Sequence, residues 1–298
     1  MKSNIIKKAV GYNYVKLRII ICSRVLGDYM TPDPVVKISE RADAKGSLVL
    51  SCFPSVSMVS SIVAHYLIEH MELGFVGGVR DERLPPVCMV QDGKPLPPIR
   101  IYSGKPVDSK ICDKIILIVS EMKVHDSITL PIAESLLEWS KEMDFQGGIL
   151  IDAFARKGLE ENSAKDQPMV EYDNTPDVDI LGIGATDNML EKLDEMGVTH
   201  LEQGVLSGMN AVLLGEGRRR GLDIMALLVE ADPRYPDARA AAKLIEILDK
   251  LLPNIKLDTE PLIEEAERIE MQIKSMMESQ LQPGSSDSTS SNDNMLYG

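Results

Sequence analysis

The sequence predicts an α/β fold: a layered domain with a largely parallel central sheet, an antiparallel edge ribbon, and a C-terminal helix followed by a flexible tail. Three observations support this. Between residues 31 and 257, short apolar runs alternate with longer segments of helical character. Several runs are almost entirely branched aliphatic, as in parallel strands buried on both faces. A proline-rich pair of extended segments interrupts the alternation, and prolines confine such strands to an edge.

The central strands are expected where apolar residues continue without interruption between polar or turn residues. The clearest is Lys114 to Ser120, whose interior consists only of isoleucine, leucine and valine. The other predicted strands are 47–52, 75–79, 148–152, 178–184 and 222–229. Helices between these strands favour parallel pairing, because parallel strands need long crossover connections.

Five helices are predicted in the domain. Residues 56–71 show apolar side chains at 3.6-residue spacing, and residues 208–220 end at Gly221, a typical C-terminal helix signal. The other three helices are expected at 128–143, 187–196 and 236–252. The polar stretch 156–176 is expected to form a loop.

The edge ribbon is predicted from a hairpin signal at Asp92-Gly93. Its strands are expected at 87–90 and 99–102. The surrounding prolines favour an edge position: Pro85, Pro86, Pro95, Pro97 and Pro98.

The C-terminal helix, predicted at 258–281, differs from the others. Its apolar residues are spaced alternately four and three apart, which is typical of a packing seam. This helix packs on its own domain or on a neighbouring subunit, and we slightly favour a subunit interface. The seam consists of Leu262, Ala266, Ile269, Ile273 and Met276.

Composition limits the classes of partner. The chain has 298 residues, 44% of them hydrophobic, and a net charge of −14. Residues 1–30 carry six Lys/Arg against one acid, so the remainder is more acidic still. Such a body argues against nucleic acid or an anionic membrane as the main partner. The basic extension is either a mobile arm or the result of a start assigned upstream of Met30.

The four cysteines show no metal-binding spacing, and buried thiols of a cytoplasmic protein are expected. No apolar run is long enough to span a membrane.

The last segment, 282–298, is rich in Ser, Asp and Asn and is expected to be a flexible tether. Its final 16 residues would span roughly 20–24 Å as a random coil. It ends in Leu296-Tyr297-Gly298, where an aromatic ring with a hydroxyl precedes a free carboxylate. Such an end can dock into a pocket that captures the carboxylate. An ordinary frayed terminus is the alternative.

Four ordered motifs carry a family resemblance over residues 31–270. Residues 51–60, SCFPSVSMVS, resemble a G-F-P-G-V-G-L-V-G turn, and 84–102 resemble an F-P-P-V-x-x-V-x-D-G-x-P-x-x-P-x-R-I-Y ribbon. Residues 202–214 match a glycine-rich helix entry, and 229–242 are similar to A-E-A-N-P-x-Y-P-D-P-R-A-A-A. With the tail, these motifs resemble the archaeal-type proteasome assembly chaperone family. The signature residues are Phe53, Pro54, Pro85, Pro86, Asp92, Gly93, Gly208, Glu230, Pro233, Tyr235, Pro236, Asp237 and Arg239.

The resemblance implies a fold akin to nucleoside phosphorylases without their catalysis. It implies a homo-oligomer acting as an ATP-independent factor that binds proteasome α-subunits of the 20S core. The terminal Leu296-Tyr297-Gly298 resembles the hydrophobic-tyrosine-X tail with which proteasome activators and assembly chaperones enter α-ring pockets. The chain departs from the family in the first turn, where Ser55, Ser57 and Ser60 replace glycines.

Nothing in the sequence demands catalysis, so no enzyme, cofactor or metal is expected. The best enzymatic alternative is a nucleoside phosphorylase-like cleft near Glu230, Asp232 and Arg234, since α/β sheets bind ligands at the carboxyl ends of their strands. The structural alternative is that Asp232 and Asp237 cap the next helix while the arginines pair with the acids. A further alternative is an oligomeric scaffold with an inert tail that partners a paralogue.

Overall fold

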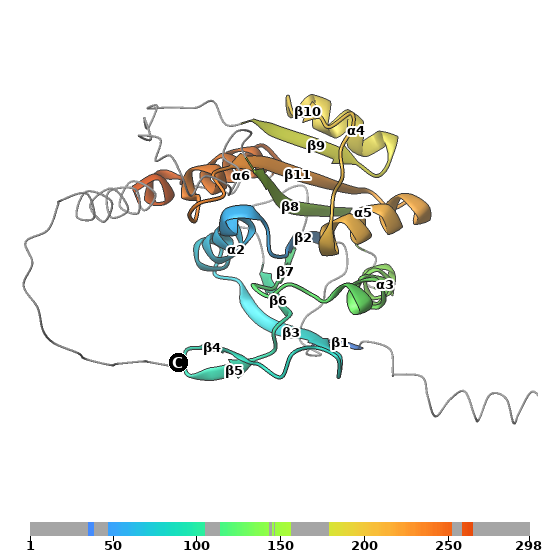
Figure 1. Cartoon of the computed structure of the whole chain (residues 1–298), viewed down its shortest axis with the longest axis vertical. Coiled ribbons are helices and arrows are strands. Elements are labelled where there is room, and N and C mark those ends of the chain that lie inside the picture. Colours follow the sequence, from blue (N-terminus) through green and yellow to red (C-terminus); the bar gives the residue numbers. More distant parts are fainter. Residues whose placement is uncertain are drawn as a thin grey trace, which may run out of the picture.

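The computed structural model describes residues 35–38, 47–104, 114–142, 145, 147–155, 179–251 and 258–264. Within these residues the chain forms one nine-stranded sheet with helices on both faces and a separate two-stranded ribbon (Figure 1). In the large sheet the strands follow the order β1-β3-β6-β7-β2-β8-β11-β9-β10. Their bounds are Val35–Ile38 (β1), Leu48–Cys52 (β2), Gly74–Arg80 (β3), Arg100–Gly104 (β6), Ile115–Val119 (β7), Gly147–Ala155 (β8), Ile180–Gly184 (β9), Thr199–His200 (β10) and Ile224–Ala231 (β11).

The predicted α/β fold class is confirmed. Four adjacent strands, β7, β2, β8 and β11, are parallel and form the centre of the sheet. The sheet continues through antiparallel pairs, β6 against β7 on one side and β9 against β11 on the other. The segment predicted as a strand at 178–184 therefore exists but runs against its neighbour. The short strands β1 and β10 at the two edges were not anticipated from the sequence.

The ribbon requires a correction. Asp92-Gly93 does form a hairpin turn, with φ of 50° and 71°, but the strands it joins are β4 (Met89–Gln91) and β5 (Lys94–Leu96). The expected return strand at 99–102 was wrong, because a two-residue turn reverses the chain at once and pairs Gln91 with Lys94. Residues 100–104 instead form β6, inside the large sheet between β3 and β7.

All five predicted domain helices are confirmed, with ends that differ by at most a few residues. They are α2 (Val59–His70), α3 (Asp126–Glu142), α4 (Asp187–Glu195), α5 (Gly208–Arg220) and α6 (Ala238–Leu251). A short 3₁₀ turn, η1 (Val56–Met58), precedes α2. Figure 1 shows α2 and α6 on one side of the sheet and α3 and α5 on the other.

Each face of the sheet has its own hydrophobic core. Alternate residues of a strand point to opposite faces, and in β7 Ile115, Leu117 and Val119 face one core while Ile116 and Ile118 face the other. The first core receives side chains from α2, α4 and α6, and the second from α3 and α5. The helices are thus held by burial against the sheet, at about 25 cal/mol per Å² of apolar surface.

Several predicted segments lie outside the described residues: the basic extension, the loop 156–176, most of the C-terminal helix and the tail. Of that helix, residues 260–264 are described and are helical. Leu262 is half-buried and packs against the core beneath α2 and α6. Within the described part of the chain, no helix is both long and apolar enough to cross a membrane.

Candidate functional site

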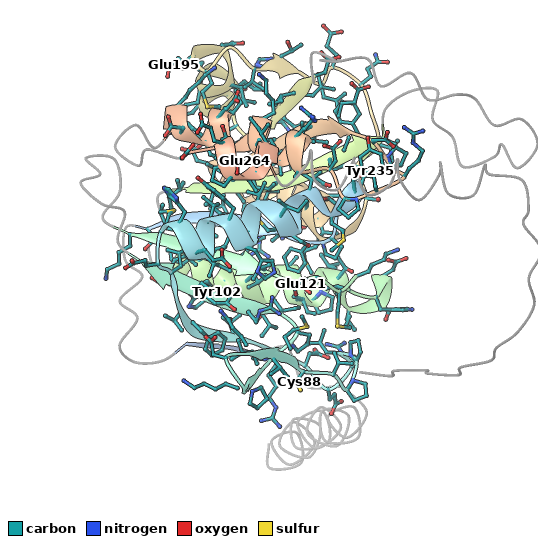
Figure 2. The ribbon with its side chains drawn as sticks, turned by 90° about the vertical axis from the view of Figure 1, so that its left-hand side faces the viewer. Cys88, Tyr102, Glu121, Glu195, Tyr235 and Glu264 are labelled. Atoms are coloured by element: carbon teal, nitrogen blue, oxygen red, sulfur yellow. The ribbon has the colours of Figure 1, made fainter. Side chains whose placement is uncertain are left out.

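The parallel strands bring two loops together beside β8, at their carboxyl ends. The turn after β2, the end of β8 and the loop after β11 meet here, since these strands are adjacent and run in the same direction. Binding sites of α/β sheets commonly lie at this edge. The loop after β11 contains the signature residues that sequence reasoning singled out, including Tyr235 (Figure 2).

The turn between β2 and α2 adopts an unusual backbone. Ser57 and Met58 both have left-handed conformations, with φ of 57° and 55°. This conformation costs an L residue roughly 1–2 kcal/mol. Two contacts hold the turn: the Ser57 hydroxyl donates to the Asp232 carbonyl, and the Asp237 N–H donates to the Ser57 carbonyl at 3.0 Å. The turn after β2 is therefore tied to the loop after β11.

The other two serines that replace family glycines also make hydrogen bonds. The Ser55 hydroxyl accepts from the Ser60 N–H at 3.0 Å, and the Ser60 hydroxyl donates to the carbonyl of Ile151, in the middle of β8, at 2.8 Å. Ser60 is fully buried. Each serine of this turn thus contributes a side-chain hydrogen bond that glycine could not make.

Asp237 is the N-cap of α6. One carboxylate oxygen accepts from the Ala240 N–H at 2.9 Å, and the other accepts from the Asp232 N–H at 3.0 Å. Both bonds are buried, so this carboxylate supports the helix start and the preceding loop together. The predicted capping role of Asp237 is confirmed.

Asp232 does not cap the helix, which corrects that part of the expectation. Its carboxylate instead forms a two-pronged ion pair with the guanidinium of Arg234, with Nε to Oδ1 at 2.8 Å. The loop brings the two side chains together because they are two residues apart. Burial alone would raise the pKa of Asp232, but the hydrogen bonds and charge of Arg234 outweigh it and lower that pKa. The acid and base proposed for an enzymatic cleft are therefore bound to each other.

Beneath these loops lies a buried polar group on β8 and α5. The Asn210 amide donates to the Ile151 carbonyl at 2.9 Å and to the Asp152 carboxylate at 3.2 Å. Burial raises the pKa of Asp152. Burial, with the nearby Asp152 charge, also strongly raises the pKa of the Cys52 thiol, which is fully buried. A protonated, inaccessible thiol is a poor nucleophile, so Cys52 is a core residue.

A second charged cluster lies beside α2 (Figure 2 labels Glu121). Arg100, only 2% exposed, forms an ion pair with Glu121, and His65 on α2 contacts the same carboxylate oxygen at 3.0 Å. Burial would raise the pKa of Glu121, but the hydrogen bonds from His65 and Arg100 lower it to about 2. This cluster joins α2 to the sheet at β6 and β7.

The structure separates the predicted signature residues into two regions. Phe53, Pro54, Glu230, Pro233 and the segment Tyr235 to Asp237 lie at the carboxyl edge, with Arg239 in the first turn of α6. Gly208 begins α5 with a φ of 78°, which favours glycine.

Asp92 and Gly93 form the turn of the ribbon, away from that edge. Pro85 and Pro86 precede its first strand, close to Cys88, which Figure 2 labels. Ala266, Ile269, Ile273 and Met276 lie outside the described residues, as do Leu296, Tyr297 and Gly298. In the described ranges, no three His, Cys, Asp or Glu side chains gather as metal ligands would.

Sequence reasoning did not identify Asp152, Arg100 or Glu121 as members of polar clusters. A signal was present for each, since every one is a charged residue within or next to a strongly apolar strand segment. A charge in such a position is seldom buried unless it is paired. Their partners could not be named, because the pairs join residues from different strands and helices.

The comparisons with known proteins agree with this architecture. The PAC2 family model matches residues 49–277, and the chain belongs to that family. The chain is similar to Pyrococcus furiosus PbaA, an archaeal homologue of proteasome-assembly chaperone: 27% identity and a TM-score of 0.69, covering 84% of this chain and 93% of PbaA. The resemblance to the archaeal-type proteasome assembly chaperone family is thus confirmed.

Two further proteins are similar to this chain. An uncharacterised protein of Methanocaldococcus jannaschii is 27% identical over 248 residues, which cover 83% of this chain and 92% of that protein. Pyrococcus furiosus PbaB, an archaeal proteasome activator, has a TM-score of 0.66 over 82% of this chain and 99% of its own. Its identity is 17%, so this likeness shows the fold alone.

Proposed function

We propose that this protein is an ATP-independent proteasome-binding chaperone that docks its C-terminal Leu296-Tyr297-Gly298 into pockets between proteasome α-subunits. Membership of the PAC2 family and the similarity to PbaA, a homologue of proteasome-assembly chaperone, support the class of function. The C-terminal sequence supports the mode of binding. The partner is the 20S core, and the task is to align α-subunits for assembly or to cap the finished ring.

The observation that carries the docking proposal is the chemistry of the last three residues. Leucine and the tyrosine ring supply apolar area, the phenol supplies a hydroxyl, and the terminal carboxylate supplies a charge for a lysine or for backbone N–H groups. The acidic body also suits a partner whose pockets are basic.

Oligomerisation would make the weak binding of each C-terminal tail effective. Once one tail is bound, the others search at a high effective concentration, so the assembly binds far more tightly than one tail. We assign the subunit contact to the seam Ala266, Ile269, Ile273 and Met276, which continues from Leu262. Because Leu262 packs on its own core, the helix would leave the body at a fixed point.

We also propose that the protein is not an enzyme. Asp232 and Arg234 neutralise each other, and Asp237 is committed to capping α6. Cys52 is buried and protonated. A thermal-shift screen with nucleosides and inorganic phosphate tests this proposal, since a specific, saturable rise in the unfolding midpoint would contradict it.

The docking test compares the full chain with Tyr297→Ala, Tyr297→Phe and a variant extended by two glycines after Gly298. Pull-down of purified proteasome α-rings should be lost with Tyr297→Ala and weakened with the other two. Tyr297→Phe lacks only the hydroxyl, whereas the extension displaces only the carboxylate. Equal recovery of α-rings by all four proteins, at unchanged oligomer mass, would refute tail docking and favour a scaffold that binds a paralogue.

A further inference from the structure

A cavity of about 220 Å³ lies on the α3/α5 face of the sheet, away from the loops at the carboxyl edge. Val49, Ile118 and Leu150 form its floor, and Leu136 on α3 and Leu213 on α5 form its walls. These five side chains are apolar. The cavity therefore suits an apolar group, because well-formed ligand pockets are lined mainly by such side chains.

The cavity exists in part because β8 carries a glycine at this position. Gly148 lies on the same face as Leu150, two residues along the strand, and lines the cavity. A Cβ placed on Gly148 would meet the Ile224 side chain at 3.5 and 3.8 Å, which is ordinary contact. The site could therefore accept a larger residue without a backbone clash, and glycine leaves the space open.

Two charged side chains line the cavity, Lys141 and Asp223. Lys141 lines the cavity and is exposed to solvent, so it marks the side that opens outward. Asp223 also lines it, but both of its carboxylate oxygens are engaged, by Thr186 at 2.6 Å and Asn188 at 2.7 Å. The Lys141 ammonium is thus the charge best placed to bind a ligand.

We propose that this cavity is a binding site for a small amphiphile, an apolar chain with an anionic head, whose chain lies between α3, α5 and the sheet and whose head pairs with Lys141. A dry cavity of about 150 Å³ binds benzene in another protein, so 220 Å³ holds a somewhat larger group, roughly eight carbons. The proposal is independent of tail docking, since the two involve different residues.

The chain contains one tryptophan, and its position provides the readout. Trp139 is buried on α3, and its ring meets that of Phe145 edge to face, with centroids 4.9 Å apart. Phe145 lines the cavity. A ligand that enters should therefore shift Phe145 and change the fluorescence of Trp139.

The test titrates the full-length protein with straight-chain carboxylates from butanoate to decanoate and follows Trp139 fluorescence. Each added methylene should tighten Kd about fourfold until the cavity is full. Gly148→Val should weaken octanoate binding at least tenfold. Gly148→Ala should weaken it less, and this variant provides the test if the valine variant does not fold. Gly74→Ala, a methyl added to a strand elsewhere, should leave binding unchanged, because its Cβ meets only the Ser103 carbonyl, at 3.9 Å.

The head group is tested with Lys141→Met, which keeps the aliphatic stem and removes the charge. Octanoate should bind several-fold more weakly and octanol equally well, whereas Lys192→Met, on α4, should change neither. No saturable response at any chain length, or an equal response in Gly148→Val, would overturn the proposal. Displacement of octanoate by a peptide of residues 290–298 would also overturn it, because the occupant would then be the chain's own end.

Discussion

The two faces of the sheet are built differently. On the α2/α6 face, Ala240 and Ala241 of α6 are small and fully buried in the core, and Leu67 of α2 is also fully buried. On the α3/α5 face, the helices cover a cavity above Gly148. Both faces bury long apolar side chains, and on the α3/α5 face part of the space above the sheet stays unfilled.

This comparison shows where the domain has unfilled internal volume. The α2/α6 face is held by buried side chains of α2 and α6, by the Arg100–Glu121–His65 cluster and by the Asp237 cap. Protein interiors are packed like organic crystals, and removal of atoms there is costly. The α3/α5 face retains unfilled volume, which is the usual property of a binding site rather than of a core.

A large effect is expected at the ion pair on the α2 side. Glu121→Gln leaves the buried Arg100 charge without its counter-charge and should lower the free energy of unfolding by about 3 kcal/mol. Chemical denaturation measures it. The double change Arg100→Met and Glu121→Leu should recover most of the loss, and a double variant no more stable than Glu121→Gln would contradict this explanation.

The same pair predicts a dependence on pH. The folded pKa of Glu121, about 2, lies below its unfolded value, so the carboxylate stabilises the folded state above the unfolded pKa of about 4.5. That stabilisation should fall as the pH decreases from about 5 to 2. Unfolding midpoints across this range should decline less steeply in Glu121→Gln than in the unaltered protein. Parallel declines would contradict the assignment.

A matched pair of leucines compares the two cores directly. Leu67→Ala, on the α2/α6 face, removes a fully buried side chain and should cost about 3–4 kcal/mol, within the range for buried leucines. Leu213→Ala should cost at least about 1 kcal/mol less, because that side chain already faces unfilled space and has fewer contacts to lose. Urea midpoints of the two variants decide the comparison, and equal losses would mean that the cavity collapses or is filled.

The helix cap should contribute a smaller amount. Asp237→Ala removes an N-cap and leaves the buried Asp232 N–H without an acceptor, so a loss of about 2 kcal/mol is expected. Asp237→Asn keeps an oxygen for one N–H and should lose about half as much. Thermal unfolding of both variants measures the effect. If Asp237→Asn loses as much stability as Asp237→Ala, the hydrogen bond that asparagine keeps contributes nothing.

The smallest effect is a gain at the turn after β2. Met58 is 54% exposed in a left-handed conformation, so Met58→Gly should remove strain at little loss of packing. Relief of roughly 1–2 kcal/mol is offset by the entropy of glycine, for a net gain of about 0.5 kcal/mol. Met58→Ala keeps the Cβ and should show no gain in the same denaturation experiment. A gain of equal size in both would rule out backbone strain.

Much of the fold could be predicted because hydrophobic pattern determines local structure. The isoleucine-rich run of β7 and the helical spacing of α2 each have a single good interpretation. The direction of β9 could not be predicted, since strand direction depends on the path of the chain between strands. The return strand of the ribbon was misplaced because 99–102 is also a good strand sequence, and its partners in β3 and β7 are distant in sequence.

Part of the candidate site at the carboxyl edge was also predictable, because helix caps follow from local sequence. Asp237 as a cap follows from a short acidic side chain ahead of an alanine-rich helix. The Ser57–Asp232 contact joins residues 175 apart, and the Arg100–Glu121–His65 cluster joins two strand ends and a helix. The cavity depends on the absence of a side chain at Gly148, which becomes meaningful only after α3 and α5 are placed.

We propose above all that the protein binds the proteasome α-ring through its last three residues. The most direct test is the mass of the complex formed by the full chain with purified α-subunits, compared with a chain ending at Met295. We expect a defined complex with the full chain and only the separate components with the shortened one. A complex of the same mass and stability without Leu296-Tyr297-Gly298 would contradict the proposal.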